Sequence, residues 1–177
     1  MRILISVASK HGATAEMGQA MAEVLIGHGI EVRVEAPEAV DSIAAYDGVI
    51  LGSAVYAGHW MAEARDLVER CRPQFAELPV WLFSSGPIGE PPKPEEEPVD
   101  VAPITEATGA VGHIVFAGKL DRKLLGFGER AIVTAFRAPD GDFRDWDEIR
   151  DWASAIAGDL KTRARPKELV GPFDTIG

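Results

Sequence analysis

Cysteine is nearly absent from this chain: its 177 residues include only Cys71. One thiol excludes a disulfide framework and any metal or iron–sulfur site built from cysteines, so no metal centre is expected. Because Cys71 falls in the apolar pattern of an expected helix, we predict a buried structural thiol.

Long apolar runs are also missing, and none would cross a bilayer. The charged and then apolar opening is too short for a signal peptide. We therefore expect a cytoplasmic protein with at most peripheral membrane contact.

Basic residues are scarce, with 18 Lys and Arg against 28 Asp and Glu and a net charge of −10. This balance makes nucleic acid an unsuitable partner, because binding phosphates of a polymer requires a basic face. The acidity favours solubility, and it would also attract partner proteins with basic surfaces. A length of 177 residues with 46% hydrophobic content predicts a single domain over residues 1–177.

The N-terminal segment is typical of a phosphate site. An apolar strand over 3–7 leads through a loop over 9–14 into a helix over 14–28. The first turn of a helix offers free N–H groups and a partial positive charge. Ser9 and Thr14 would add hydroxyl donors, and Gly12 would allow a close approach of the backbone. Neither G-x-G-x-x-G nor the Lys-[Ser/Thr] end of a P-loop occurs there.

Strands and helices alternate along the rest of the chain. Apolar strands are predicted over 3–7, 46–51, 79–84 and 113–117, and a strand of alternating pattern is predicted over 30–34. A first helix is predicted over 14–28, with Gly29 as its C-terminal cap. A second is predicted over 61–70 and is closed by Pro73, and a third begins after an N-cap at Asp145 or Asp147. The pattern predicts an α/β fold, a three-layer α/β/α sandwich around a five-stranded parallel sheet of order 2-1-3-4-5.

A ligand of such a sheet lies beyond the carboxyl ends of its strands, where loops over 8–13, 53–60 and 84–97 should meet. The second loop holds Tyr56, His59 and Trp60 around Gly58, so its aromatic rings are suited to a flat ring system. The third begins with SSGPIG, whose backbone N–H groups would form the rim of that ring.

These segments resemble the flavodoxin-like, FMN-binding superfamily, and within it the chain is most similar to the menaquinone-dependent protoporphyrinogen oxidases (dehydrogenases) of bacteria. The resemblance rests on SKHGAT, DGVILGSAVYAGHW, VFAGKLD and DFRDWDEIRDWA. It implies non-covalent FMN, with its phosphate at Ser9, His11, Gly12 and Thr14. The full expected cofactor site comprises Ser9, Lys10, His11, Gly12, Ala13, Thr14, Ser53, Ala54, Val55, Tyr56, Ala57, Gly58, His59, Trp60, Ser85, Gly86 and Pro87.

Three functions remain open at this point. The first is an FMN-dependent oxidoreductase that takes electrons from a substrate such as a porphyrinogen and passes them to a quinone. The second is a flavodoxin-type electron carrier between redox-partner proteins. The third is a fold that has lost FMN and serves as a binding module. This function stays open because Ala13 stands where many flavodoxins carry Asn and because the loop contains the Lys10–His11 pair. The loops are also compatible with a deazaflavin as the cofactor.

Histidines and two surface segments allow more than one interpretation. His59 has the right pKa range for a general acid or base, but it would equally serve as a hydrogen-bonding loop residue. His28 and His113 have the pattern of structural residues. A stripe of Leu125, Ile132 and Phe136 at helical spacing favours core packing over a surface helix that meets a bilayer or a quinone. The loop over 93–100 favours a solvated excursion over a lid.

Overall fold

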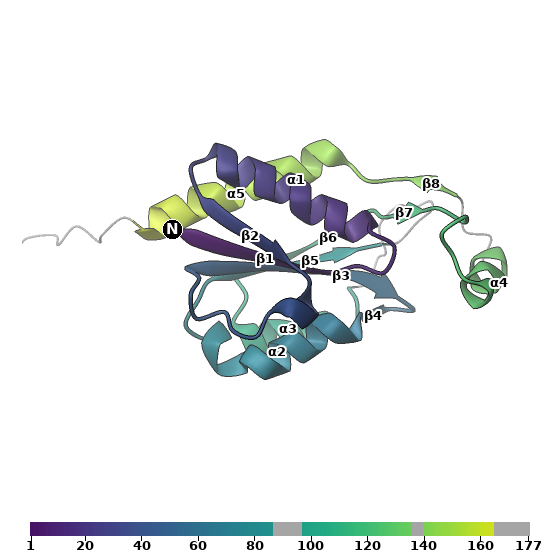
Figure 1. Ribbon diagram of the computed structural model, residues 1–177, viewed down its shortest axis with the longest axis horizontal. Coiled ribbons are helices and arrows are strands. Elements are labelled where there is room, and N and C mark those ends of the chain that lie inside the picture. Colours follow the sequence, from purple (N-terminus) through teal and green to yellow (C-terminus); the bar gives the residue numbers. More distant parts are fainter. Residues whose placement is uncertain (87–96, 136–139, 165–177) are drawn as a thin grey trace, which may run out of the picture.

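A parallel sheet forms the centre of the protein in the computed structural model, which describes residues 1–86, 97–135 and 140–164. Its hydrogen-bonded path runs β2-β1-β3-β5-β6, and every neighbouring pair on it is parallel (Figure 1). The strands are β1 (Arg2–Ala8), β2 (Glu31–Glu35), β3 (Gly48–Tyr56), β5 (Val80–Ser85) and β6 (Gly112–Phe116). Counted along the chain, these five give the order 2-1-3-4-5, so the predicted topology is confirmed.

Helices cover both faces of this sheet (Figure 1). On one face lie α1 (Ala13–Gly27) and α5 (Trp146–Ala164), and on the other lie α2 (Ala62–Phe75) and α3 (Val101–Thr108). Each face has its own apolar core: α1 and α5 pack on Ile3, Ile5 and Ile50, whereas α2 packs on Leu4, Leu51 and Leu82. The two cores follow from the alternation of side chains along each strand, and the three-layer α/β/α sandwich is confirmed.

Helix ends agree with the sequence except in α2. Gly29 has a left-handed φ of 80° after α1, and Asp145 caps α5 by accepting from the amides of Asp147 and Glu148, both at 3.0 Å. Pro73, however, lies inside α2, so the predicted end of that helix was wrong. The last turn continues past the proline because Cys71 and Phe75 are fully buried in the core. The buried thiol at Cys71 is thereby confirmed, and its desolvation raises the pKa of the thiol.

Further elements gather beyond the carboxyl ends of the parallel strands. The short strand β4 (His59–Trp60) turns back along β3, and β7 (Lys119–Leu120) pairs with β8 (Gly141–Asp142). Between β7 and β8 lies α4 (Phe127–Ala135), which stands apart from both helix layers (Figure 1). A 3₁₀ turn, η1 (Pro37–Ala39), follows β2. Of these additions, β7 and α4 contribute residues to the edge at which a ligand was expected, whereas η1 packs against α2.

The structure describes only part of the apolar stripe predicted from Leu125, Ile132 and Phe136. Leu125 is buried as expected, but it lies outside both core clusters. Phe127 is 94% exposed. The side chain of Ile132 and the whole of Phe136 lie outside the described residues, as do residues 93–96 of the acidic loop. Among the helices that are described, none has the length and apolar content to cross a membrane.

Candidate functional site

A cavity of about 520 Å³ lies at the carboxyl ends of β1, β3 and β5. The cavity includes the switch point between β1 and β3, whose following helices α1 and α2 cover opposite faces of the sheet (Figure 1); open α/β sheets bind their ligands at such a point. Its walls are the loop after β1, the end of β3, the end of β5, and the segment from Gly118 through α4. The lining residues are Ser9, His11, Ala13, Thr14, Glu16, Ala54, Val55, Tyr56, Ala57, Ser85, Gly86, Gly118, Lys119, Leu120, Asp121, Leu124, Leu125, Glu129 and Val133.

The phosphate loop, residues 9–14, forms one end of the cavity. Gly12 adopts a left-handed φ of 85° and begins α1 without any side-chain hydrogen bond to the helix end. The amides of the first turn therefore have no side-chain cap at this end, and α1 itself offers them no partner. Ser9 and Thr14 line the cavity beside them, with Thr14 only 3% exposed. Free amides, two hydroxyls and a helix N-terminus together fit a phosphate group.

Arg144 holds the start of α1 in place. Its side chain is 2% exposed, and its guanidinium donates to the carbonyl oxygen of Ala13 at 2.9 Å. It also forms ion pairs with Glu16 at 2.7 Å and Asp142 at 2.6 Å. The hydrogen bond from Arg144 lowers the pKa of the Asp142 carboxyl. The guanidinium lies 4.4 Å from the ring centre of Trp146. The sequence analysis did not find this residue, which joins β8 and α5 to the phosphate loop.

A second charged cluster joins the phosphate loop to α4. One oxygen of the Glu129 carboxylate accepts from Lys10 Nζ at 2.7 Å and from His11 Nε2 at 3.1 Å. Its other oxygen accepts from the Gly126 amide at 2.8 Å. The hydrogen bond from Lys10, followed by those from Gly126 and His11, lowers the pKa of Glu129 to about 2. Glu129 is therefore a carboxylate at neutral pH, and it lies in the wall of the cavity.

The middle of the cavity has the character of a site for a flat ring. Tyr56, at the end of β3, is 41% exposed and lines it together with Ala54 and Val55. Burial, with a smaller contribution from Glu129, raises the pKa of the Tyr56 phenol. Lys10 Nζ lies 5.9 Å from the centre of the Tyr56 ring.

Two glycines shape the opposite rim of the cavity. Gly86, with a φ of 120°, follows β5, and Gly118 follows β6. A Cβ on Gly118 would approach the Gly86 backbone to 2.9 Å, so the two segments can pass this closely only with glycine at Gly118.

Several predicted residues lie away from the cavity. Its lining does not include Lys10, Gly12, Ser53, Gly58, His59 or Trp60, although Lys10 and Gly12 belong to the phosphate loop. Trp60 is 2% exposed and donates from Nε1 to Ser84 Oγ at 2.8 Å, so its ring is not available to a ligand. The hydroxyl of Ser53 donates to the Ala54 carbonyl at 2.8 Å and accepts from the Met61 amide at 2.9 Å. Pro87 lies outside the described residues.

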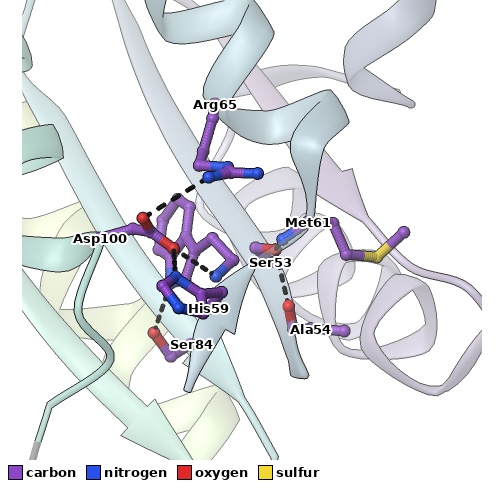
Figure 2. Close-up of polar contacts among 8 residues, drawn as sticks. Ser53, Ala54, His59, Met61, Arg65, Ser84 and Asp100 are labelled. Atoms are coloured by element: carbon purple, nitrogen blue, oxygen red, sulfur yellow. Dashed lines mark hydrogen bonds and ion pairs between the residues drawn. The ribbon is translucent and has the colours of Figure 1, made fainter. Parts of the chain in front are cut away.

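Asp100 organises the turn that contains His59. Figure 2 shows its carboxylate between the side chains of His59 and Arg65. It accepts from His59 Nδ1 at 3.1 Å and from the Trp60 amide at 2.8 Å, and it lies 3.7 Å from Arg65 Nη1. This pairing ties the turn between β3 and β4 to the start of α3. The hydrogen-bonding interpretation of His59 therefore fits the geometry better than the acid–base one.

A buried polar chain runs from β4 to β6. Because Trp60 Nε1 can only donate, Ser84 Oγ accepts from it and is free to donate to His113 Nε2, at 2.8 Å. His113 Nδ1 then faces the carboxylate of Glu97 at 3.0 Å. The order of acid, histidine and serine matches that of a hydrolase triad. Ser84 is fully buried, however, so its oxygen cannot reach a substrate, and the chain has a structural role.

Comparison with known proteins identifies the family. The sequence model of the flavodoxin domain matches residues 4–147, and the chain therefore belongs to the flavodoxin domain family. The cofactor predicted from the sequence, FMN, is the cofactor of this family, and the phosphate loop fits it. No curated protein matches the chain in sequence.

Solved structures agree with this fold. A flavodoxin from the domain Archaea is 16% identical over 91% of this chain and 99% of its own, with a TM-score of 0.61. The flavodoxin of Megasphaera elsdenii is 18% identical over 88% of this chain and 98% of its own, with a TM-score of 0.59. Rubredoxin oxygen:oxidoreductase of Desulfovibrio gigas is 15% identical over 93% of this chain but only 37% of its own, with a TM-score of 0.61.

At such identities these structures support the fold alone. None of the matches described above is a protoporphyrinogen oxidase. The finer resemblance to that group, with its quinone and porphyrinogen partners, has no support from them.

Proposed function

We propose that this protein is an electron carrier that uses bound FMN to pass electrons between partner proteins. The observation that carries the proposal is a cavity with a phosphate-type loop at one end, in a domain that aligns with nearly the whole of a flavodoxin. The cavity lies at the end of β1 and β3, and the matched region covers 99% of the archaeal flavodoxin. When bound, FMN supplies the redox chemistry, and the protein supplies binding and the local field.

The residues of the cavity divide this work among them. The amides of the first turn of α1, with Ser9 and Thr14, would hold the phosphate. Tyr56 and the backbone around Gly86 would contact the ring. Arg144 would keep the phosphate loop in position without touching the cofactor. We extend the proposal to the whole chain as one domain over 1–177; a cytoplasmic location stays a prediction.

The acidity of the chain suits a carrier. A net charge of −10 raises the electrostatic attraction to partner proteins with basic surfaces and speeds their encounter. It also raises the free-energy cost of adding negative charge to a bound ring, which would lower the potential of the cofactor.

A flavoenzyme that acts on an apolar small molecule is the second candidate, and one observation favours it. Leu124, Leu125 and Val133 form an apolar wall on the side of the cavity away from the sheet. Such a wall would suit a quinone or a porphyrinogen next to the ring as well as it suits the ring itself.

Electron transfer from the reduced protein separates the two candidates. The FMN-loaded protein is reduced with dithionite, freed of excess reductant, and mixed under anaerobic conditions with either cytochrome c, a basic protein that accepts one electron, or a soluble quinone. A carrier should reduce cytochrome c faster than the quinone, and its rate should fall as salt is added. Free reduced FMN is the control, because its rate should depend much less on salt. Rapid oxidation by the quinone with no transfer to cytochrome c would contradict the proposal and favour the enzyme.

A further inference from the structure

Glu129 reaches the phosphate loop from a distant part of the chain. It follows Lys10 by 119 residues, yet its carboxylate accepts from Lys10 Nζ at 2.7 Å and from His11 Nε2 at 3.1 Å. The second carboxylate oxygen is held by the Gly126 amide. Three donors therefore converge on one carboxylate, and two of them come from the loop that the cofactor phosphate needs.

The same carboxylate shares the cavity with the phosphate site. Ser9, His11, Thr14 and Glu129 all line it. A phosphate at the first turn of α1 would therefore lie in the same cavity as a group of like charge. Phosphate and carboxylate oxygens are both strong anionic acceptors, and each prefers ammonium and imidazole N–H donors. The cationic and imidazole side chains of the loop, Lys10 and His11, are already paired with Glu129.

We propose that Glu129 is a specificity-determining residue that competes with the FMN phosphate for Lys10 and His11. It thereby limits how strongly the site prefers FMN over riboflavin, which has the same ring and no phosphate. The proposal rests on the assignment of FMN to this cavity. When the phosphate takes these donors, Glu129 loses two of its three partners and keeps the Gly126 amide, so the link between the phosphate loop and α4 weakens.

A different role for Glu129 predicts the opposite result. If its only task is to fasten α4 over the cavity, its loss would loosen the apolar wall formed by Leu124, Leu125 and Val133. That wall would contact the ring rather than the phosphate. FMN and riboflavin would then lose affinity by the same factor.

Affinities for FMN and riboflavin, measured by quenching of flavin fluorescence at low salt, separate these roles. In Glu129→Gln the amide oxygen can still accept from Gly126, but the negative charge is gone. We expect this variant to bind FMN about fivefold more tightly, the effect of one partly exposed charge pair, and to bind riboflavin unchanged. Glu23→Gln is the matched control. Glu23 is an exposed residue of α1, more than two helical turns away from the phosphate loop, and its replacement changes the net charge by the same amount as Glu129→Gln. It should alter neither affinity.

Adding Lys10→Met to Glu129→Gln should remove most of the gain in FMN affinity. Equal weakening of both ligands by Glu129→Gln, or no change in the FMN-to-riboflavin ratio, would overturn the proposal. So would a failure of both wild type and variant to bind FMN.

Hydrogen exchange of the wild-type protein gives a test that needs no variant. The Gly126 amide donates to Glu129, so its exchange should be faster with FMN than with riboflavin. Equal protection by the two ligands would count against the competition. A failure of the proposed function can be told apart from a failure of this proposal. A wild-type protein that binds FMN but does not reduce cytochrome c would contradict the electron-carrier function, and it would leave the expected effect of Glu129 on the ratio of FMN to riboflavin affinity unchanged.

Discussion

Replacing Arg144 by methionine removes the buried cation that supports the phosphate loop. The variant keeps an apolar stem of similar length, so the main loss is polar. The Ala13 carbonyl loses a charged donor at 2.9 Å, and Glu16 and Asp142 lose ion pairs of 2.7 and 2.6 Å. Hydrogen bonds to charged groups contribute about 1.5–3 kcal/mol each, and breaking a buried ion pair costs about 3–5 kcal/mol.

The expected cost lies below the sum of these values. The two carboxylates are 55% and 39% exposed, so water regains part of the interaction with each. We therefore expect Arg144→Met to lower the free energy of unfolding by about 2–4 kcal/mol. At roughly 2–4 °C per kcal/mol for a chain of this size, the Tm should fall by about 4–16 °C. Because α1 loses its support at the phosphate loop, FMN affinity should fall as well.

Urea denaturation of the apoprotein at neutral pH measures this cost, and Arg150→Met is its matched control. Arg150 lies over the same Trp146 ring at 5.9 Å, but it is exposed and its ion pair with Asp147 spans 3.9 Å. Its replacement should change stability by less than about 0.5 kcal/mol. If Arg144→Met is as stable as Arg150→Met, Arg144 does not hold α1 in place and the argument for a braced phosphate loop is refuted.

Three further predictions concern the phosphate, the buried polar chain and acid stability. Thr14→Val should weaken FMN binding about 10- to 100-fold, because one hydrogen bond to a charged phosphate is lost, and should leave riboflavin affinity unchanged; unaltered FMN titrations would place the phosphate elsewhere. Ser84→Ala should lower the free energy of unfolding by about 1–3 kcal/mol, since the buried Trp60 Nε1 loses its acceptor. Its control is Ser154→Ala on the exposed face of α5, which should leave the free energy of unfolding unchanged in the same urea assay. The folded-state pKa of Glu129 is depressed from 4.5 to about 2, so its contribution to stability is complete above pH 4.5 and is lost as the pH falls toward 2. Wild type should therefore lose more stability over this range than Glu129→Gln, and parallel pH curves would exclude the depressed pKa.

Most of the sheet could be predicted because β1, β3 and β5 are short, nearly continuous apolar runs. Such runs bury both faces and leave few alternatives to a parallel sheet. The strand, loop and helix at the N-terminus could be predicted for a related reason: they follow one another within residues 2–27, so local sequence contains the whole arrangement. The N-cap at Asp145 is equally local.

The residues that brace the site were missed because their partners are remote in sequence. Arg144 and Ala13 are separated by 131 positions, and Glu129 and Lys10 by 119. A lone arginine before a helix, or a lone glutamate within one, reads as an ordinary surface charge. The pairing of β7 with β8 brings together the segments that carry these two residues.

Trp60 shows why residue type alone misplaces a ligand contact. Tyr56 and Trp60 lie in one aromatic loop, and both rings were expected near the ligand. The antiparallel turn between β3 and β4 separates them: Val55 pairs with Trp60, and Tyr56 pairs with His59. The indole then enters the core and gives its N–H to Ser84, while the phenol ring stays at the cavity. A two-residue strand thus places the Tyr56 ring, and not the Trp60 ring, at the cavity, and the hydrogen bond from the Trp60 amide to Asp100 fixes the turn between them.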